Sequence, residues 1–366
     1  MAKAHISTPL LNVSMKNHPA ARGALLALLS SLLFGASTPL LQRLGVGVGA
    51  WMTAAMLYAG AAVAGLLLRS GSAKEASVRR VHWPRLFCMA LFGAVIGPAA
   101  LAWGLQRTSS ISASLMLTLE AVFTVLLSCL LYREQMDRRV GLAIALLTLG
   151  GILLVLDRTG NGSPQLAGLL AVLGATVSWG LDNTLSRALA DSDPGRVVLG
   201  KAALGAACSF MLAAASGETA LSFNAGTGLF LIGATGYGLS LRFYLLAQRA
   251  FGAARTGSVF ATAPFIGAFI AFGLGDRGGS LYLLGAATLM LAGVFLHLTE
   301  QHEHEHRHEA LQHEHTHTHD DGHHTHGHAT MPVGAHSHPH AHEPMRHSHA
   351  HTPDLHHVHQ HGEKRQ

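Results

Sequence analysis

The first candidates for chemistry are charged residues that stand inside long apolar runs of this sequence: Glu120, Asp182 and Arg242. A charge near the centre of a bilayer costs about 2.5–3.5 kcal/mol, so such residues are expected to face the protein interior or a water-filled cavity. A carboxyl group held there can bind a cation or gain and lose a proton. The structural alternative is that Glu120 or Asp182 only ties two helices together. Arg242 needs an acidic partner, for which these two are the candidates, or its guanidinium group clamps a carboxylate.

Polar, proline and tryptophan residues in the same runs complete the predicted cavity. Pro39, Pro98 and Pro264 each remove one backbone hydrogen bond, which frees a carbonyl for a ligand or simply kinks the helix. Tryptophan can stack on a substrate or anchor a helix at the membrane interface. We predict a substrate and coupling cavity lined by the following residues: Glu120, Asp182, Asn183, Arg242, Trp103, Trp179, Thr38, Pro39 and Pro264.

Histidine dominates the last part of the chain, because all but four of the 27 histidines follow residue 299. Neutral imidazole is a good ligand for Zn²⁺, Ni²⁺, Cu²⁺ and Co²⁺, and alternation of His with other residues places imidazoles on one side of an extended chain. The alternative is a solubilising tail whose charge changes near pH 6.5. No cofactor is expected to be required. A divalent transition metal is the candidate ligand for these histidines: His302, His304, His306, His308, His313, His315, His317, His319, His323, His324, His326 and His328.

The elements that must position these residues are membrane-spanning helices. Hydrophobic residues make up 49% of the chain and charged residues 12%. An apolar run of about 20 residues crosses a bilayer as a helix. We expect ten such runs at approximately these residues: 23–44, 48–68, 86–105, 109–132, 140–156, 166–189, 197–215, 227–247, 256–274 and 280–298. The segment 299–366 has too few aliphatic residues to bury a core, so we expect a disordered tail.

The runs form two copies of one pattern. Gln106-Arg107 corresponds to Gln248-Arg249 and Thr118 to Thr262, at an offset of 142 to 144 residues. Each copy has five spans, and an odd number inverts the second copy relative to the first. Inverted repeats that hold a substrate between them are a transporter architecture. The fold class is therefore an all-α polytopic membrane protein, with ten transmembrane helices as two inverted five-helix repeats and a His-rich tail. Its parts are a cytoplasmic segment 1–22, repeats 23–156 and 165–298, and the tail 299–366.

Lysine and arginine set the expected orientation. With a cytoplasmic N-terminus, the loops on the inside hold 15 of these residues and the loops on the outside hold four. The positive-inside rule therefore predicts that both termini are cytoplasmic. The expected partners are the lipid bilayer and a small-molecule substrate, but no nucleic acid. Divalent metal ions and a homodimer remain further candidates. We expect no enzymatic activity, because the sequence has no nucleophile–base set and no phosphate-binding loop.

The end of each copy carries a family resemblance. The stretches LTLEAVFTVLLSCLLYREQ and GLAIALLTLGGILLVL close the first copy, and SVFATAPFIGAFIAFGL and GAATLMLAGVFLHL close the second. They resemble the EamA-type members of the drug/metabolite transporter superfamily, which have two repeats of five spans. The resemblance covers residues 23–298 and implies export of amino acids, other metabolites or drugs from a bacterial inner membrane, often coupled to protons. Glu120 departs from the repeat symmetry, because Pro264 stands at its position in the second copy.

These observations leave three functional hypotheses. The first is a proton-coupled secondary transporter that exports small metabolites, amino acids or drugs by alternating access, with Glu120 as the coupling group. The second is a transition-metal exporter or metal-tolerance protein whose tail collects Ni²⁺, Co²⁺ or Zn²⁺. The third is a membrane-anchored metal buffer or sensor that transports nothing.

Overall fold

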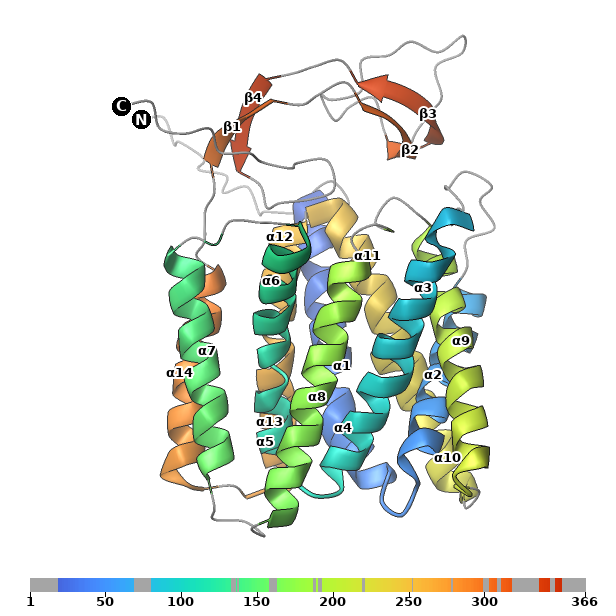
Figure 1. Cartoon of the computed structure of the whole chain (residues 1–366), viewed down its shortest axis with the longest axis vertical. Helices are drawn as coiled ribbons and strands as arrows, with labels where there is room; N and C mark the ends of the chain where they lie inside the picture. Colours follow the sequence, from blue (N-terminus) through green and yellow to red (C-terminus); the bar gives the residue numbers. More distant parts are fainter. Residues whose placement is uncertain are drawn as a thin grey trace, which may run out of the picture.

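The computed structural model describes residues 19–68, 80–132, 136, 138–157, 163–186, 189, 193–218, 221–251, 253–277, 279–298, 303–307, 311–317, 336–342 and 346–350. Helices form the body (Figure 1). The first half contains α1 (Pro19–Leu44), α2 (Ala50–Leu67), the 3₁₀ helix η2 (Arg80–His82), α3 (Trp83–Ala90), the π-helix η3 (Leu91–Ile96), α4 (Gly97–Leu105), α5 (Ser110–Met116), α6 (Leu119–Tyr132) and α7 (Arg138–Leu156). The second half contains α8 (Ser163–Ser186), α9 (Pro194–Ala215), α10 (Phe223–Ile232), the π-helix η5 (Gly233–Leu239), α11 (Ser240–Phe251), α12 (Ala253–Phe260), α13 (Ala263–Gly273) and α14 (Leu281–Leu298).

Several of these helices join end to end into longer rods. The π-helix η3 connects α3 to α4, and η5 connects α10 to α11, whereas short turns join α5 to α6 and α12 to α13. Within the described residues, nine rods are long and apolar enough to cross a membrane. The prediction of an all-α polytopic membrane protein is therefore confirmed for the body. The tenth predicted span corresponds to α14, whose apolar stretch Leu281–Leu296 is shorter than the other nine.

The two halves pack through corresponding helices. α1 lies against α11 and α13 of the second half, and α8 lies against α4 and α6 of the first. α2 packs along α9, and α7 packs along α14 at one edge of the bundle (Figure 1). Glycine also allows α2 and α10 to approach closely, because a Cβ added at Gly60 in α2 would lie 2.0 Å from the carbonyl oxygen of Phe230 in α10. Backbones that meet in this way gain dispersion contact in lipid, where the hydrophobic effect does not drive helix association.

Two helix irregularities recur at equivalent places in both halves. η3 interrupts the third rod of the first half, and η5 interrupts the third rod of the second. Turns at Leu117–Thr118 and Ala261–Thr262 interrupt the fourth rods. Both pairs keep the offset of 142 to 144 residues that relates the two sequence copies. Such π segments and broken helices are frequent at functional sites, because they free backbone groups from the regular ladder.

Threonine and proline account for the breaks in the fourth rods. The Thr118 hydroxyl donates to the carbonyl oxygen of Leu115 (2.8 Å), and the Thr262 hydroxyl donates to that of Val259 (2.6 Å). These side chains compete with the backbone donors of a continuous helix. Pro264 lies in the first turn of α13, where its missing N–H costs nothing. The first half has Glu120 at the corresponding place, in the first turn of α6.

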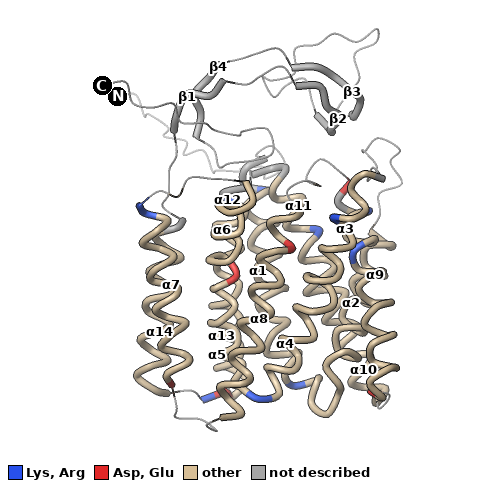
Figure 2. Tube along the Cα trace, in the orientation of Figure 1, with Lys and Arg blue, Asp and Glu red and all other residues tan. Residues whose placement is uncertain are grey.

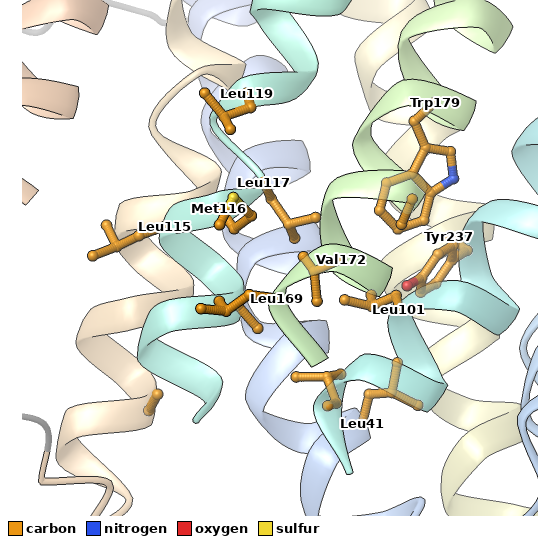
Figure 3. Close-up of a cluster of buried hydrophobic side chains, with 14 of the residues drawn as sticks. Leu41, Leu101, Leu115, Met116, Leu117, Leu119, Leu169, Val172, Trp179 and Tyr237 are labelled. Carbon is orange, nitrogen blue, oxygen red and sulfur yellow. The ribbon is translucent and has the colours of Figure 1, made fainter. Parts of the chain in front are cut away.

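Apolar side chains fill the centre of the bundle. Figure 3 shows Leu101, Leu117, Leu169 and Val172 between Trp179 at one end of the cluster and Leu41 at the other. Charged positions gather at the two ends of the bundle, while the acidic positions of α6 and α8 lie between them (Figure 2). This pattern fits a body whose middle faces hydrocarbon and whose ends face water.

The His-rich tail differs from the predicted disorder over four segments. These are the strands β1 (Glu303–Arg307), β2 (Leu311–His317), β3 (His336–His342) and β4 (Arg346–Ala350). β1 pairs with β4 and β2 with β3, both antiparallel, outside the helical bundle (Figure 1). The physical reason is the period of two in the sequence, which matches the side-chain alternation of a strand. Low hydrophobicity, on which we based the prediction, does not prevent backbone pairing between such segments.

Candidate functional site

A cavity of about 100 Å³ lies between the two halves of the protein. It is lined by Phe34, Tyr58, Glu120, Trp179, Asp182, Asn183, Lys201, Gly236, Tyr237, Ser240, Leu241, Tyr244 and Phe260. A second cavity of about 190 Å³ adjoins it and shares Phe34, Glu120, Asn183, Tyr244 and Phe260. The shared residues make the two cavities lobes of one site. Its lining includes Leu117, Thr118 and Ala261 of the two breaks and Gly236 and Tyr237 of η5, so several irregular parts of the fold border it.

Glu120 lies where the two lobes meet. The break before Leu119 makes Glu120 part of the first turn of α6. A helix N-terminus carries partial positive charge and stabilises a nearby carboxylate. Glu120 Oε1 accepts a hydrogen bond of 2.6 Å from Asn183 Nδ2 of α8. The structure therefore brings together Glu120, Asn183 and Asp182, as the sequence predicts, and holds the Glu120 carboxyl group from two helices.

Asp182 forms a buried ion pair with Lys201 of α9, and both side chains are at most 9% exposed. The Lys201 ammonium group donates to Asp182 Oδ2. Asp182 Oδ1 is also buried and has no hydrogen-bond partner among the described residues. The pair needs glycine beside it, because a Cβ on Gly93 would lie 2.3 Å from Asp182 Oδ2.

Lys201 was not among the predicted site residues. The prediction that Arg242 is the cationic partner of the acidic residues is wrong for Asp182, which pairs with Lys201. Arg242 lines neither lobe. The signal for Lys201 was present, since a single lysine inside the apolar run 197–215 obeys the same rule as Glu120. Arg242 follows η5, and the extra residue of a π turn rotates the next helix by about 100° relative to a regular one.

The carbonyl oxygen of Gly93 joins three helices beside the cavity. It accepts hydrogen bonds from the Tyr58 hydroxyl (2.5 Å) and from Trp179 Nε1 (3.0 Å). A π-helix would supply a backbone donor five residues later, but that residue is Pro98, which has no N–H. The Gly93 carbonyl is thus freed by a proline, as predicted, and two side chains of this protein bind it.

Aromatic rings line the cavity in a continuous series. Phe34 contacts Trp179, Tyr237 and Phe260, with ring centroids 6.1, 5.8 and 5.3 Å apart. Tyr58 contacts Tyr237 at 5.7 Å, and Tyr244 contacts Phe260 at 5.0 Å. Of these six residues only Trp179 was predicted as a site residue. The others look like ordinary apolar residues in the sequence, and only the packing of α1, α2, η5, α11 and α12 brings them together.

The remaining predicted site residues divide between the cavity and the opposite end of the bundle. Pro264 lines the second lobe. Thr38 is buried in α1 but lines neither lobe. Pro39 lines a separate recess with Gln42 and Asp276. Trp103 is 38% exposed, and the guanidinium group of Arg107 lies 3.6 Å from the centre of its ring. The predicted stacking role of Trp103 is therefore wrong for this cavity, because α4 directs that side chain outward.

Hydrogen bonds close the end of the bundle where α1 ends. Gln42 Nε2 donates to the carbonyl oxygens of Leu105 (2.8 Å) and Thr108 (2.7 Å), and the Ser110 hydroxyl donates to Gln42 Oε1. Ser280 of the second half donates to Asp157 Oδ2 of the first (2.5 Å). Together with the apolar cluster of Figure 3, this network separates the cavity from that end.

The metal prediction concerns other parts of the chain. The residues that the structure describes contain no group of three or more His, Cys, Asp or Glu side chains able to hold a metal ion. Five of the predicted ligands fall on described strands, where the register places His304 opposite His349, His306 opposite His347, and His313, His315 and His317 opposite His340, His338 and His336. The other predicted ligands lie outside the described residues: His302, His308, His319, His323, His324, His326 and His328.

Comparison with known proteins agrees with this architecture. Residues 21–156 match the sequence model of the EamA-like transporter family, a range that nearly coincides with the first predicted repeat. An uncharacterized transporter of Methanothermobacter thermautotrophicus is 28% identical over 232 residues, which cover 61% of this chain and 66% of that relative. The match thus spans slightly less than two thirds of the relative's length. One solved crystal structure of a protein superimposes with a TM-score of 0.56 over 75% of this chain and 94% of its own, and at 17% identity this likeness concerns the fold alone. Residues 21–156 are therefore similar in sequence to the EamA-like transporter family, and the apolar helices of the described residues indicate a multi-pass membrane protein.

Proposed function

We propose that this protein is a secondary transporter of a small organic solute, which binds in the two-lobed cavity and crosses the membrane by alternating access. The observation that carries the proposal is the position of Glu120, an acidic residue between two lobes that are walled by both halves. A cavity at an interface of repeats with broken helices is the arrangement in which transporters bind their substrates. The ten spans, the inversion of the repeats, the cytoplasmic termini and the bacterial inner membrane belong to this proposal.

Proton coupling at Glu120 is the mechanistic part of the proposal. Its carboxyl group is held by Asn183 and lies beside a cavity, so it can exchange a proton with water or yield to a bound solute. The Asp182 carboxylate is less suited to this role, because Lys201 neutralises it. In an exporter of this kind, a proton from outside replaces the solute on Glu120 and resets the site.

Flux in proteoliposomes tests the proposal. Vesicles containing the full chain and a trapped pH indicator are exposed to amino acids, amines and drugs, and solute-driven proton movement is recorded. We expect Glu120→Gln to abolish this movement while the protein stays folded. The matched control is Glu218→Gln, since Glu218 accepts from the backbone N–H of Met52 at 2.9 Å and lies in neither lobe. Proton-coupled flux that persists in Glu120→Gln would remove Glu120 from the mechanism.

A metal-linked function is the second candidate, and the paired strands of the tail favour it. Five cross-strand positions of the backbone register pair His with His. Such pairs suit imidazole ligation of a divalent transition metal. A metal exporter would lose metal flux when the chain ends near residue 300. A metal buffer or sensor would retain metal binding by the tail on any membrane anchor, with no flux.

A further inference from the structure

We propose that the substrate of this cavity is an organic cation, an amine or quaternary ammonium compound with an apolar body. This inference deepens the proposed function and rests on it for the transport step, but not for binding. It names which group the cavity recognises: a positive head placed between Glu120 and the aromatic series, and a hydrocarbon or aryl body placed in the second lobe.

The charges of the lining favour a cation. The charged residues of the first lobe are Glu120, Asp182 and Lys201. Lys201 is already paired with Asp182 Oδ2, so the pair is neutral as a unit and leaves no free ammonium group for an anionic substrate. Ionised Glu120 then gives the lobe a net negative charge. Asp182 Oδ1 adds a buried acceptor that no described residue satisfies. A buried acceptor of this kind favours a ligand that can donate to it.

Aromatic rings make up much of the lining. The Tyr58 hydroxyl and Trp179 Nε1 both donate to the carbonyl oxygen of Gly93, so these polar atoms are already used. Phe34, Tyr237 and Phe260 contribute further rings, and the Tyr237 hydroxyl is buried without a hydrogen-bond partner among the described residues. A cation over such rings gains about 0.5–2 kcal/mol each, and quaternary ammonium groups are recognised by cages of this composition.

The second lobe provides for the body of the substrate. Beside Glu120 its lining is mainly aliphatic or aromatic, and includes Leu117, Ala121, Val125, Pro264 and Val294. Burial of an apolar body here gains about 25 cal/mol per Å². A bare metal ion would gain nothing from this lobe. The described lining also offers only two carboxylates, one of which is occupied by Lys201, whereas a divalent ion requires more ligands.

A series of compounds with one aryl body and different heads tests the inference directly. Titration calorimetry with the full chain in detergent compares 2-phenylethylamine, phenethyltrimethylammonium, 2-phenylethanol, 3-phenylpropionate and phenylalanine. We expect both cations to bind on the order of tenfold more tightly than the alcohol, since that ratio corresponds to about 1.4 kcal/mol of charge and cation–π interaction. Glu120→Gln should reduce this advantage, since only the aromatic rings would then favour the cations, and should leave the affinity for the alcohol unchanged, which shows that the variant retains its cavity. Glu218→Gln should bind all five compounds as the wild type does.

Three results would overturn the inference. The first is that phenylalanine or 3-phenylpropionate binds at least as tightly as the amine, which would mean that Lys201 serves the substrate carboxylate. The second is that Glu120→Gln keeps the full preference for cations. The third is that neither cation binds the wild type at millimolar concentration. The transport step is judged separately: cation binding without flux in proteoliposomes refutes the proposed transport alone, whereas flux of phenylalanine without cation binding refutes only the inference about the substrate.

Discussion

Removal of one member of the Asp182–Lys201 pair should destabilise the protein strongly, whereas removal of both should not. Both side chains are at most 9% exposed, so solvent does not screen the charge that remains after one is deleted. Breaking a buried pair in this way costs about 3–5 kcal/mol, while an apolar replacement of both members is often neutral. We therefore expect Asp182→Asn and Lys201→Met each to lose about 3–5 kcal/mol. The double variant should recover most of that loss.

Thermal unfolding in detergent measures the effect, with a far-ultraviolet circular dichroism signal for the helices. A loss of 1 kcal/mol lowers Tm by about 2–4 °C in a domain of 150–250 residues, so each single variant should melt on the order of 10 °C below the wild type. The matched control is the half-exposed pair Asp193–Arg196, with an N–O distance of 3.4 Å, an Arg196 side chain that is 46% exposed and an Asp193 side chain that is 11% exposed. Arg196→Gln should cost less than about 1 kcal/mol.

The outcome that would refute the reasoning is a double variant as unstable as the sum of the two single variants. The two residues would then not interact, since contacting residues show coupling energies of about 0.5–3 kcal/mol in such cycles. Single variants as stable as the wild type would refute it as well, because they would mean that water reaches the pair.

Three further predictions follow from the site and the tail. Gly93→Ala should cost about 1–3 kcal/mol of unfolding free energy, because its Cβ would lie 2.3 Å from Asp182 Oδ2. Gly141→Ala in α7 is the control and should be neutral or stabilising, since no atom lies within 4 Å of its added Cβ. Thermal unfolding compares the two variants. Trp179→Phe and Tyr58→Phe should each lose about 1 kcal/mol of unfolding free energy. The double variant should lose more than the sum of the two, since the Gly93 carbonyl oxygen keeps one donor in each single variant but none in the double variant. A double variant that loses only the sum would show that water replaces the missing donors. A chain that ends near residue 300 should lose binding of Ni²⁺ or Zn²⁺ in equilibrium dialysis and keep the affinity of the cavity for phenethyltrimethylammonium; a changed affinity for the cation would contradict the separation of tail and cavity.

The sequence was sufficient for the helices and for the acidic residues of the site. Glu120 and Asp182 are predictable because the cost of a buried charge directs it inward whatever the packing of the helices. Trp179 and Pro264 also reach the cavity, as predicted. Lys201 could have been found by the same argument, since it stands alone in an apolar run.

The rest of the site depends on packing that the sequence does not express. Phe34, Tyr58 and Tyr244 are apolar or amphipathic residues in apolar runs, where lipid-facing and cavity-facing positions have the same composition. The incorrect pairing of Arg242 came from an argument on charge alone, which does not show which helices face each other. Trp103 was misplaced because its distance from the end of α4 decides between interface and interior, and apolar runs define helix ends poorly.

The neutrality of the Asp182–Lys201 pair has an electrical consequence for the transport cycle. Because the two charges cancel, the proposed transport would change the net charge of the first lobe through Glu120, which a proton or a bound monovalent cation would neutralise. One cation leaving for each proton entering then moves no net charge across the bilayer. The membrane potential, which is worth about 2.3 kcal/mol per elementary charge at 100 mV, would neither drive nor oppose such an exchange. Transport through this site would be electroneutral, and its driving force would be the pH gradient alone.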